Sequence, residues 1–291
     1  MPDMRIDAHQ HFWRLDRGDY GWLAPTLRPL YRDYLPRDLA PHLDAAGIAA
    51  TILVQAAPTE AETRFLLEIA RSTPFVAGVV GWVDMEAPDV AERLAALVTL
   101  GGGYLKGIRP MIQDIADPQW ILSPRLDRAF DALEVLGLRF DALVRPVHLE
   151  PLLRRLERRP NLKVVIDHAA KPDIAAGAKL DWSVRLASLA ARTTARCKLS
   201  GFLTEARVGA ELGDLAPFVE QVVAAFGPER IMWGSDWPVL NLASDYSTWH
   251  AMAERLVAGL SARERALIFG GVAAQFYGVP AREGVQWQPR S

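Results

Sequence analysis

Two histidines, His9 and His11, lie one residue apart in the stretch MRIDAHQHFW, although the chain of 291 residues has only six histidines. The stretch is typical of a strand, in which residues two apart point to the same side, so we expect both imidazoles to face one place. Two neutral imidazoles so placed can share one divalent ion or bind one anionic group. The alternative is that one of them only forms a hydrogen bond to a neighbouring loop. This explains a single histidine but not an inward-facing pair, because burying two polar rings without a partner is costly.

Two more apolar runs end in groups that can take part in catalysis. The run KVVIDHAAKP ends in Asp167 and His168, and a carboxylate beside a histidine can hold it in one tautomer, so we expect His168 to act as a ligand or as an acid and base. The run IMWGSDWPV carries Asp236 among bulky apolar neighbours, a poor place for a solvated turn aspartate. Asp236 is therefore the candidate general base.

Cations follow other apolar runs. Lys106 and Arg109 in YLKGIRPMIQD can bind a carboxylate, a hydroxyl-rich substrate or a developing oxyanion, or can pair with an internal acid. Lys198 precedes Ser200 in ARCKLSG and either points inward or extends to solvent. We expect His42, His148 and His250 at the surface, and Arg145 is left open between a surface residue and a candidate cation.

The motifs of several enzyme classes do not occur in the sequence. There is no G-x-S-x-G elbow, no P-loop and no dinucleotide fingerprint, which argues against serine hydrolases, nucleotide triphosphatases and dehydrogenases. A carboxylate base, imidazoles and cations together suit the attack of water on an acyl carbon.

The elements that must position these groups alternate along the chain. Short β-branched runs are separated by amphipathic helical patterns such as 61–72, 89–100, 125–137, 148–159 and 215–227. The eight predicted strands are 4–9, 50–56, 75–83, 104–110, 138–144, 163–169, 195–201 and 231–237. This order predicts a (β/α)8 TIM barrel, whose C-terminal strand ends converge on the substrate. A doubly wound sheet also alternates, but the turn HQHFWR after the first strand lacks its glycines.

We expect one domain over 1–291, with the barrel at about 4–260, C-terminal helices at about 261–279 and a tail at 280–291. Turn residues are spread along the chain and not gathered at one boundary. Ser261 and Glu264 have the capping-box spacing, which predicts a helix start and two helices packed beneath or beside the barrel.

Composition narrows the partners and the compartment. The 33 basic and 35 acidic residues give no charge excess of the kind that nucleic-acid binding needs. No apolar run reaches the roughly 18 residues of a membrane span. Cys197 is the only cysteine, and the first residues lack an apolar signal region, so we expect a cytoplasmic protein. Oligomeric state is left open.

The order of His-x-His, His168 and Asp236 in GSDWP resembles the amidohydrolase superfamily over nearly the whole chain. Within it, RIDAHQHFW, KGIRPMIQD, VVIDHAAKP, CKLSGFLTEA, MWGSDWPV and GGVAAQFYG look like the sugar-lactonase branch that contains L-fuconolactonase and L-rhamnonolactonase. The resemblance implies hydrolysis of an aldono- or aldaro-lactone, a small-molecule substrate, such as L-fucono- or L-rhamnono-lactone.

The resemblance also implies roles for particular residues. Asp236 is the base that deprotonates water and returns the proton to the leaving alkoxide, with His168 beside it. Lys106 and Arg109 match the substrate-binding segment. Trp13 and Trp237 are expected to form apolar walls for the sugar ring.

A metal centre is implied less firmly. RFDALVRP offers no histidine where metal-dependent members of the superfamily carry one, which argues against two metals. One zinc-like divalent ion on His9, His11 and Asp236, with or without His168, remains open. A metal-free mode, in which the histidines donate hydrogen bonds to the carbonyl, is the alternative. Two other functions stay open: a metal-dependent decarboxylase of aromatic acids and a non-catalytic binder of sugar acids.

Overall fold

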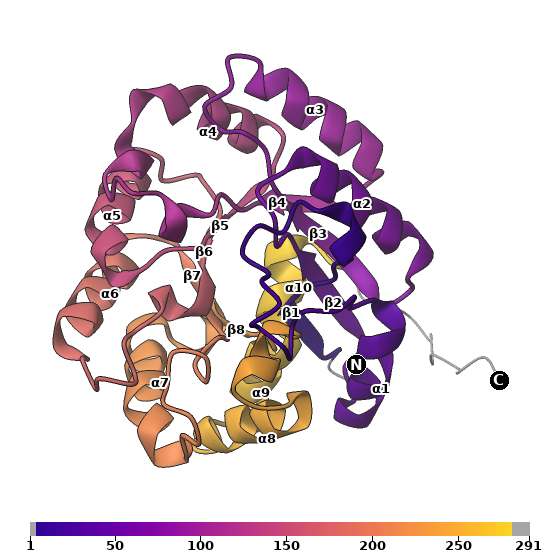
Figure 1. The fold of residues 1–291 in the computed structure, drawn as a ribbon. Coiled ribbons are helices and arrows are strands. Elements are labelled where there is room, and N and C mark those ends of the chain that lie inside the picture. Colours follow the sequence, from indigo (N-terminus) through magenta and orange to yellow (C-terminus); the bar gives the residue numbers. More distant parts are fainter. Residues whose placement is uncertain (1–3, 281–291) are drawn as a thin grey trace.

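Eight parallel strands form one sheet in chain order, β1 beside β2 and onward to β8, and helices surround it (Figure 1). The structure is a computed structural model that describes residues 4–280. The strands are β1 Ile6–Gln10, β2 Ala50–Val54, β3 Val76–Gly81, β4 Leu105–Ile108, β5 Arg139–Ala142, β6 Val164–Ile166, β7 Arg196–Leu199 and β8 Ile231–Trp233. This architecture confirms the (β/α)8 TIM barrel.

Helices follow the strands around the outside of the sheet (Figure 1). They are α1 Pro36–Ala46, α2 Glu60–Ser72, α3 Val90–Gly101, α4 Asp127–Val135, α5 Leu149–Glu157, α6 Leu180–Arg192, α7 Leu212–Phe226, α8 Tyr246–Leu256, α9 Ala262–Ala266 and α10 Val272–Tyr277. None of these described helices is long and apolar enough to cross a membrane.

The last two helices are joined by a π-helical turn, Leu267–Gly271. Ser261 and Glu264 form the expected capping box: the Ser261 hydroxyl accepts from the Glu264 backbone N–H, and Glu264 accepts from the Ser261 backbone N–H. Helix α10 packs its apolar residues against Ile6 and Met232 of the strands. It therefore covers the end of the barrel at which the strands begin. The expected tail lies, from residue 281 onward, outside the described residues.

A β-bulge in β1 decides which of its side chains face the barrel interior. Asp7 pairs with Thr51 but Gln10 pairs with Leu53, so β1 has one residue more than β2 over the same length. A bulge of this kind shifts the alternation of side chains by one position. Ile6 can therefore pack inside the barrel against α10, while His9, three residues later, also faces inward.

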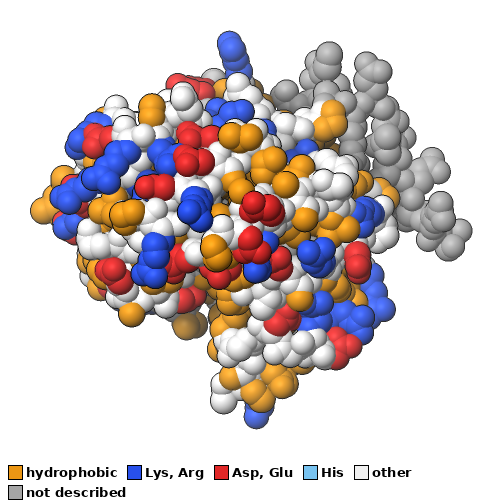
Figure 2. Space-filling model, turned by 90° about the horizontal axis from the view of Figure 1, so that it is seen from above, with side chains coloured by type: hydrophobic (Ala, Val, Ile, Leu, Met, Phe, Trp, Pro, Cys, Tyr) orange, Lys and Arg blue, Asp and Glu red, His pale blue; other side chains and the backbone are white. Residues whose placement is uncertain are grey.

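Charged side chains of both signs are interspersed over the face shown in Figure 2. This mixture agrees with the near balance of basic and acidic residues in the whole chain. On that face the protein has no extensive region of a single charge.

Candidate active site

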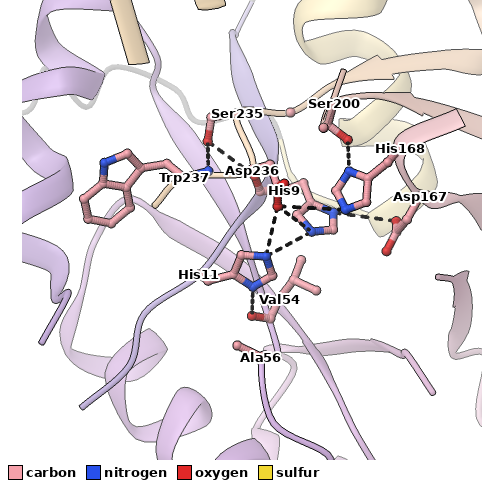
Figure 3. Close-up of polar contacts among 12 residues, drawn as sticks. His9, His11, Val54, Ala56, Asp167, His168, Ser200, Ser235, Asp236 and Trp237 are labelled. Atoms are coloured by element: carbon pink, nitrogen blue, oxygen red, sulfur yellow. Dashed lines mark hydrogen bonds and ion pairs between the residues drawn. The ribbon is translucent and has the colours of Figure 1, made fainter. Parts of the chain in front are cut away.

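Four side chains from three strands meet in one buried cluster (Figure 3). His11 Nε2 lies 3.2 Å from both His9 Nε2 and Asp236 Oδ1. His9 Nε2 and His168 Nε2 lie 3.6 and 3.9 Å from the same carboxylate oxygen. The cluster stands where β1, β6 and β8 end, as the sequence predicts for His9, His11, His168 and Asp236.

The contact between β1 and the segment after β8 positions Asp236. The Asp236 backbone N–H donates to His9 O, and the His11 N–H donates to Trp237 O, both at 2.8 Å. Asp236 itself has a left-handed backbone, with φ at 58°. A non-glycine residue takes this conformation at a cost, and such strain is concentrated at functional sites.

His168 lies in an unusual turn that follows β6. The four residues from His168 to Lys171 all have positive φ, between 48° and 61°. Ser200 Oγ lies 2.8 Å from His168 Nδ1 and so fixes the ring orientation. Gly201 must be a glycine here, because its φ is 69° and a Cβ would stand 2.7 Å from the His168 ring.

A row of buried charges lies beneath the histidines. Lys198 is fully buried, and its Nζ lies 2.7 Å from Asp141, 3.0 Å from Asp167 and 3.1 Å from His9 Nδ1. Tyr277 of α10 donates its hydroxyl to the same Asp141 oxygen. Lys198 therefore points inward, a question that the sequence left open. It links His9 to Asp141 and, through Asp141, to Tyr277 of α10.

Arg109 also reaches this cluster. Its guanidinium donates to the backbone and side chain of Gln55, and Nη1 lies 3.3 Å from both His9 Nε2 and Asp167 Oδ2. Arg109 is held on several sides, so its planar fork is oriented before any ligand binds.

The environment favours the neutral form of His9 and His168 and the charged form of Asp236. Burial lowers the pKa of His168 to about 4, and burial together with the Lys198 ammonium lowers the pKa of His9 well below its usual value. Burial alone would raise the pKa of Asp236, but its contacts with His168, His11 and His9 outweigh burial and lower that pKa. Asp236 is therefore an ionised base at neutral pH.

The ring nitrogens are suited to a ligand or a donor role. His11 Nδ1 lies 2.8 Å from the carbonyl oxygen of Val54, which can only accept, so Nδ1 carries the proton of the neutral ring. Its Nε2 is then an unprotonated nitrogen that faces Asp236. In this tautomer the lone pair of Nε2 can bind a metal ion or accept a proton.

The donor set fits one divalent ion. Atoms of His9, His168 and Asp236 all lie within 4.8 Å of one another, and His11 Nε2 lies against two of them. Ligands at about 2.1 Å from a tetrahedral zinc stand roughly 3.4 Å apart, and the ligand atoms here are separated by 3.2 to 3.9 Å in the four contacts given above. Nitrogen and carboxylate ligands are types that zinc accepts.

Lys106 is not brought to this cluster, which corrects our expectation that it binds substrate. Its side chain lies in the barrel interior against Gly78, and its pKa is lowered by burial and by Arg139. Arg139 donates to Phe276 O of α10, so Lys106 is on the α10 side of the barrel. A second bulge lies at Lys106 itself, because Val79 pairs with Leu105 and Val80 with Gly107, so β4 has one residue more than β3 there.

The two expected apolar walls are also placed elsewhere. Trp13 is fully buried and donates Nε1 to Arg32 O, and it packs edge-on to Tyr34. Trp237 is 2% exposed, contacts Tyr34 as well and is directed away from the histidines (Figure 3). Both indoles are core residues of the loops, so neither offers a ring face to a sugar.

Three further polar residues differ from the expectations or were not singled out. His148 is 4% exposed and accepts from the Arg145 backbone N–H through Nδ1, so our surface prediction for it was wrong. Asp7, which we did not single out, joins β1 to the Ser235 backbone N–H and to the Tyr246 hydroxyl. Asp141 was missed too, although a carboxylate between Phe140 and the apolar ALV of the run LRFDALV was a usable signal.

Comparison with known proteins gives the family. The family model described as amidohydrolase matches residues 6–279. The chain belongs to the amidohydrolase family. This confirms the resemblance found in the motifs around the histidine pair and Asp236.

Individual members of the amidohydrolase family are similar over nearly their full length. The chain is 46% identical to an L-fucono-1,5-lactonase from Burkholderia ambifaria over 97% of this chain and 98% of that protein. It is 38% identical, with a TM-score of 0.90, to a crystal structure of an amidohydrolase from Burkholderia multivorans with bound zinc, over 95% of this chain and all of that one.

The decarboxylase alternative is more distant. A dihydroxybenzoic acid decarboxylase from Polaromonas has a TM-score of 0.70 but only 15% identity over 98% of this chain and all of that chain. At this identity the likeness shows a shared fold alone.

Proposed function

We propose that the protein is a hydrolase that opens the ring ester of a sugar-acid lactone. The observation that carries this proposal is one ionised, buried carboxylate, Asp236, that the imidazoles of His9, His11 and His168 face. The similarity to an L-fucono-1,5-lactonase supports a lactone of this size as the substrate.

Asp236 acts as the general base. Its Oδ1 faces the histidines in a buried site, and its carboxylate takes a proton from water as the water oxygen bonds to the acyl carbon. The acyl carbon to ring oxygen bond then breaks, and Asp236 returns the proton to the leaving alkoxide. The product acid ionises at neutral pH, so each turnover releases one proton.

Arg109 and the histidines polarise the carbonyl of the lactone. Arg109 Nη1 lies 3.3 Å from His9 Nε2, so a carbonyl oxygen near His9 also lies near a fixed cation. Oriented donors of this kind stabilise the negative charge that develops on the oxygen. Ser200 holds His168 through Nδ1 and keeps its Nε2 directed at the site.

We propose that His9, His168 and Asp236, with His11 beside them, hold one divalent ion, with zinc as the best match to these ligand types. When bound, such an ion supplies a Lewis acid next to the carbonyl. Lys198 and Asp167 fix the His9 ring from behind.

We also propose that the protein works in the cytoplasm. Cys197, its single cysteine, is buried, and burial raises the pKa of its thiol well above the usual value. This thiol is therefore a poor nucleophile for disulfide exchange.

The test is a pH-indicator assay on fucono-, rhamnono-, galactono- and galactaro-lactones, with metal content measured in the same preparation. We expect proton release far above the spontaneous rate for at least one lactone. Rates equal to the spontaneous rate for the whole panel would contradict the proposal. A hydroxybenzoate is the control substrate, and carbon dioxide release from it would favour a decarboxylase.

A further inference from the structure

A cavity of about 300 Å³ opens between the loops that follow β2, β3 and β4. The residues of its lining that matter here are Trp82, Asp84, Glu86, Met111, Asp114 and Trp120. A cavity of this size is at the small end of the range for ligand sites, and it suits a sugar better than a larger molecule.

The cavity and the catalytic cluster share the segment that follows β4. Pro110 lines the cavity and directly follows Arg109, whose guanidinium lies 3.3 Å from His9 Nε2. Val80 of β3 packs inside the barrel with Ile52 and Val54 of β2. Trp82 is two residues further along, so by alternation it also faces inward, toward the barrel mouth. The cavity therefore lies at the same end of the barrel as the catalytic cluster, among the loops that follow the strands.

The walls of the cavity combine aromatic faces with carboxylates. Trp82 and Trp120 are half-buried, and Trp120 Nε1 donates to Glu86 Oε2 at 3.2 Å, which fixes that indole. Arg125 pairs with the other oxygen of Glu86 at 3.3 Å. Asp84 and Asp114 are exposed and form no ion pair within residues 4–280.

The charge of the lining is one-sided. It contains three carboxylates, and none of its residues is a lysine, arginine or histidine. Indoles can cover the apolar face of a sugar ring, and carboxylates accept hydrogen bonds from hydroxyls. A second carboxylate on the ligand would instead meet charges of its own sign.

We propose that this cavity is the subsite for the hydroxyl-bearing part of a neutral sugar lactone and that it discriminates against lactones with a free carboxylate. The inference rests on the proposed function and makes it narrower. Trp82 and Trp120 provide the ring contacts, and Asp84 and Asp114 accept from hydroxyl groups. The enzyme is accordingly an aldonolactonase and not an aldarolactonase.

Galactono- and galactaro-lactone are a matched pair of substrates, because they differ in a terminal alcohol against a carboxylate. For the wild type we expect kcat/KM on the neutral lactone to be roughly tenfold higher or more. The double variant Asp84→Asn/Asp114→Asn should narrow this ratio at least several-fold. Asp117→Asn removes an exposed charge outside the lining and should leave the ratio unchanged.

The aromatic contacts are tested with a lactone that has no hydroxyls. Trp82→Ala should lower kcat/KM on galactono-lactone by roughly 10- to 100-fold relative to δ-valerolactone, mainly through KM. Trp120→Phe, a milder change, should act in the same direction.

The outcomes separate the two proposals. A wild type that opens sugar lactones but does not prefer the neutral one, or carboxamide variants that leave the ratio unchanged, would overturn the subsite and leave the hydrolase intact. Equal losses on sugar lactone and δ-valerolactone in Trp82→Ala would do the same. A wild type that opens no lactone would overturn the hydrolase and the subsite with it.

Discussion

Replacing Lys198 by methionine tests the charged row beneath the histidines. The Lys198 ammonium is fully buried and lies within 3.0 Å of one carboxylate oxygen each on Asp141 and Asp167, which are also fully buried. Methionine has a similar length, so the change removes charge with little loss of volume.

The magnitude follows from the partners that remain. In Lys198→Met, Asp167 still has the Arg109 guanidinium at 3.3 Å, and Asp141 still accepts from the Tyr277 hydroxyl. Both carboxylates lose their ion pair with the Lys198 ammonium. Breaking a buried pair in this way costs about 3–5 kcal/mol. At roughly 2–3 °C per kcal/mol for a chain of this size, Tm should fall by about 6–15 °C.

Thermal unfolding measures this effect against two controls. Arg93→Met removes solvent-exposed pairs with Asp89 and Glu60 and should change Tm much less than Lys198→Met does. Adding Asp141→Asn to Lys198→Met removes the carboxylate that has lost its lysine partner and should recover part of the loss. A Lys198→Met protein with the Tm of the wild type would refute the reasoning, and so would a double variant no more stable than the single one.

Three further outcomes are expected. Burial raises the pKa of Glu62 to about 7 from 4.5, so the folded state favours its protonated form; about 3 kcal/mol of stability present below pH 4.5 is lost as the pH rises through 7. Glu62→Gln should therefore reduce the fall in Tm between pH 5 and 8, and an unchanged fall would contradict this origin. Ser200→Ala removes the partner of His168 Nδ1 and should lower kcat by about tenfold with little change in KM, whereas a change in KM alone would speak against an orienting role. Elemental analysis should find about one divalent ion per chain and much less in His9→Asn, and equal metal content in both proteins would exclude His9 as a ligand.

The barrel was predictable because its signals are local. Apolar β-branched runs and amphipathic helices alternate along the whole chain, and the capping box at Ser261 marks the start of α9 where the spacing indicates. His9, His11, His168 and Asp236 were found because catalytic groups in such barrels follow the strands.

Residues inside the strands were harder to place. The bulge at Lys106 has no signature in the sequence, and of the two cations in this segment only Arg109 reaches the site. Trp13 and Trp237 pack on Tyr34, a long-range contact that adjacency to a catalytic residue does not reveal. Trp82 was missed for the same reason, since loop residues are positioned by the assembled barrel.

The most direct test of the account compares wild type with Asp236→Asn on L-fucono-1,5-lactone, with proton release followed by a pH indicator. Asparagine keeps the shape of the side chain but cannot accept a proton from water. Loss of the base predicts a fall in kcat of roughly 10²- to 10⁴-fold in a protein that still folds. An Asp236→Asn protein that keeps more than about a tenth of the wild-type rate would contradict the central role of this carboxylate.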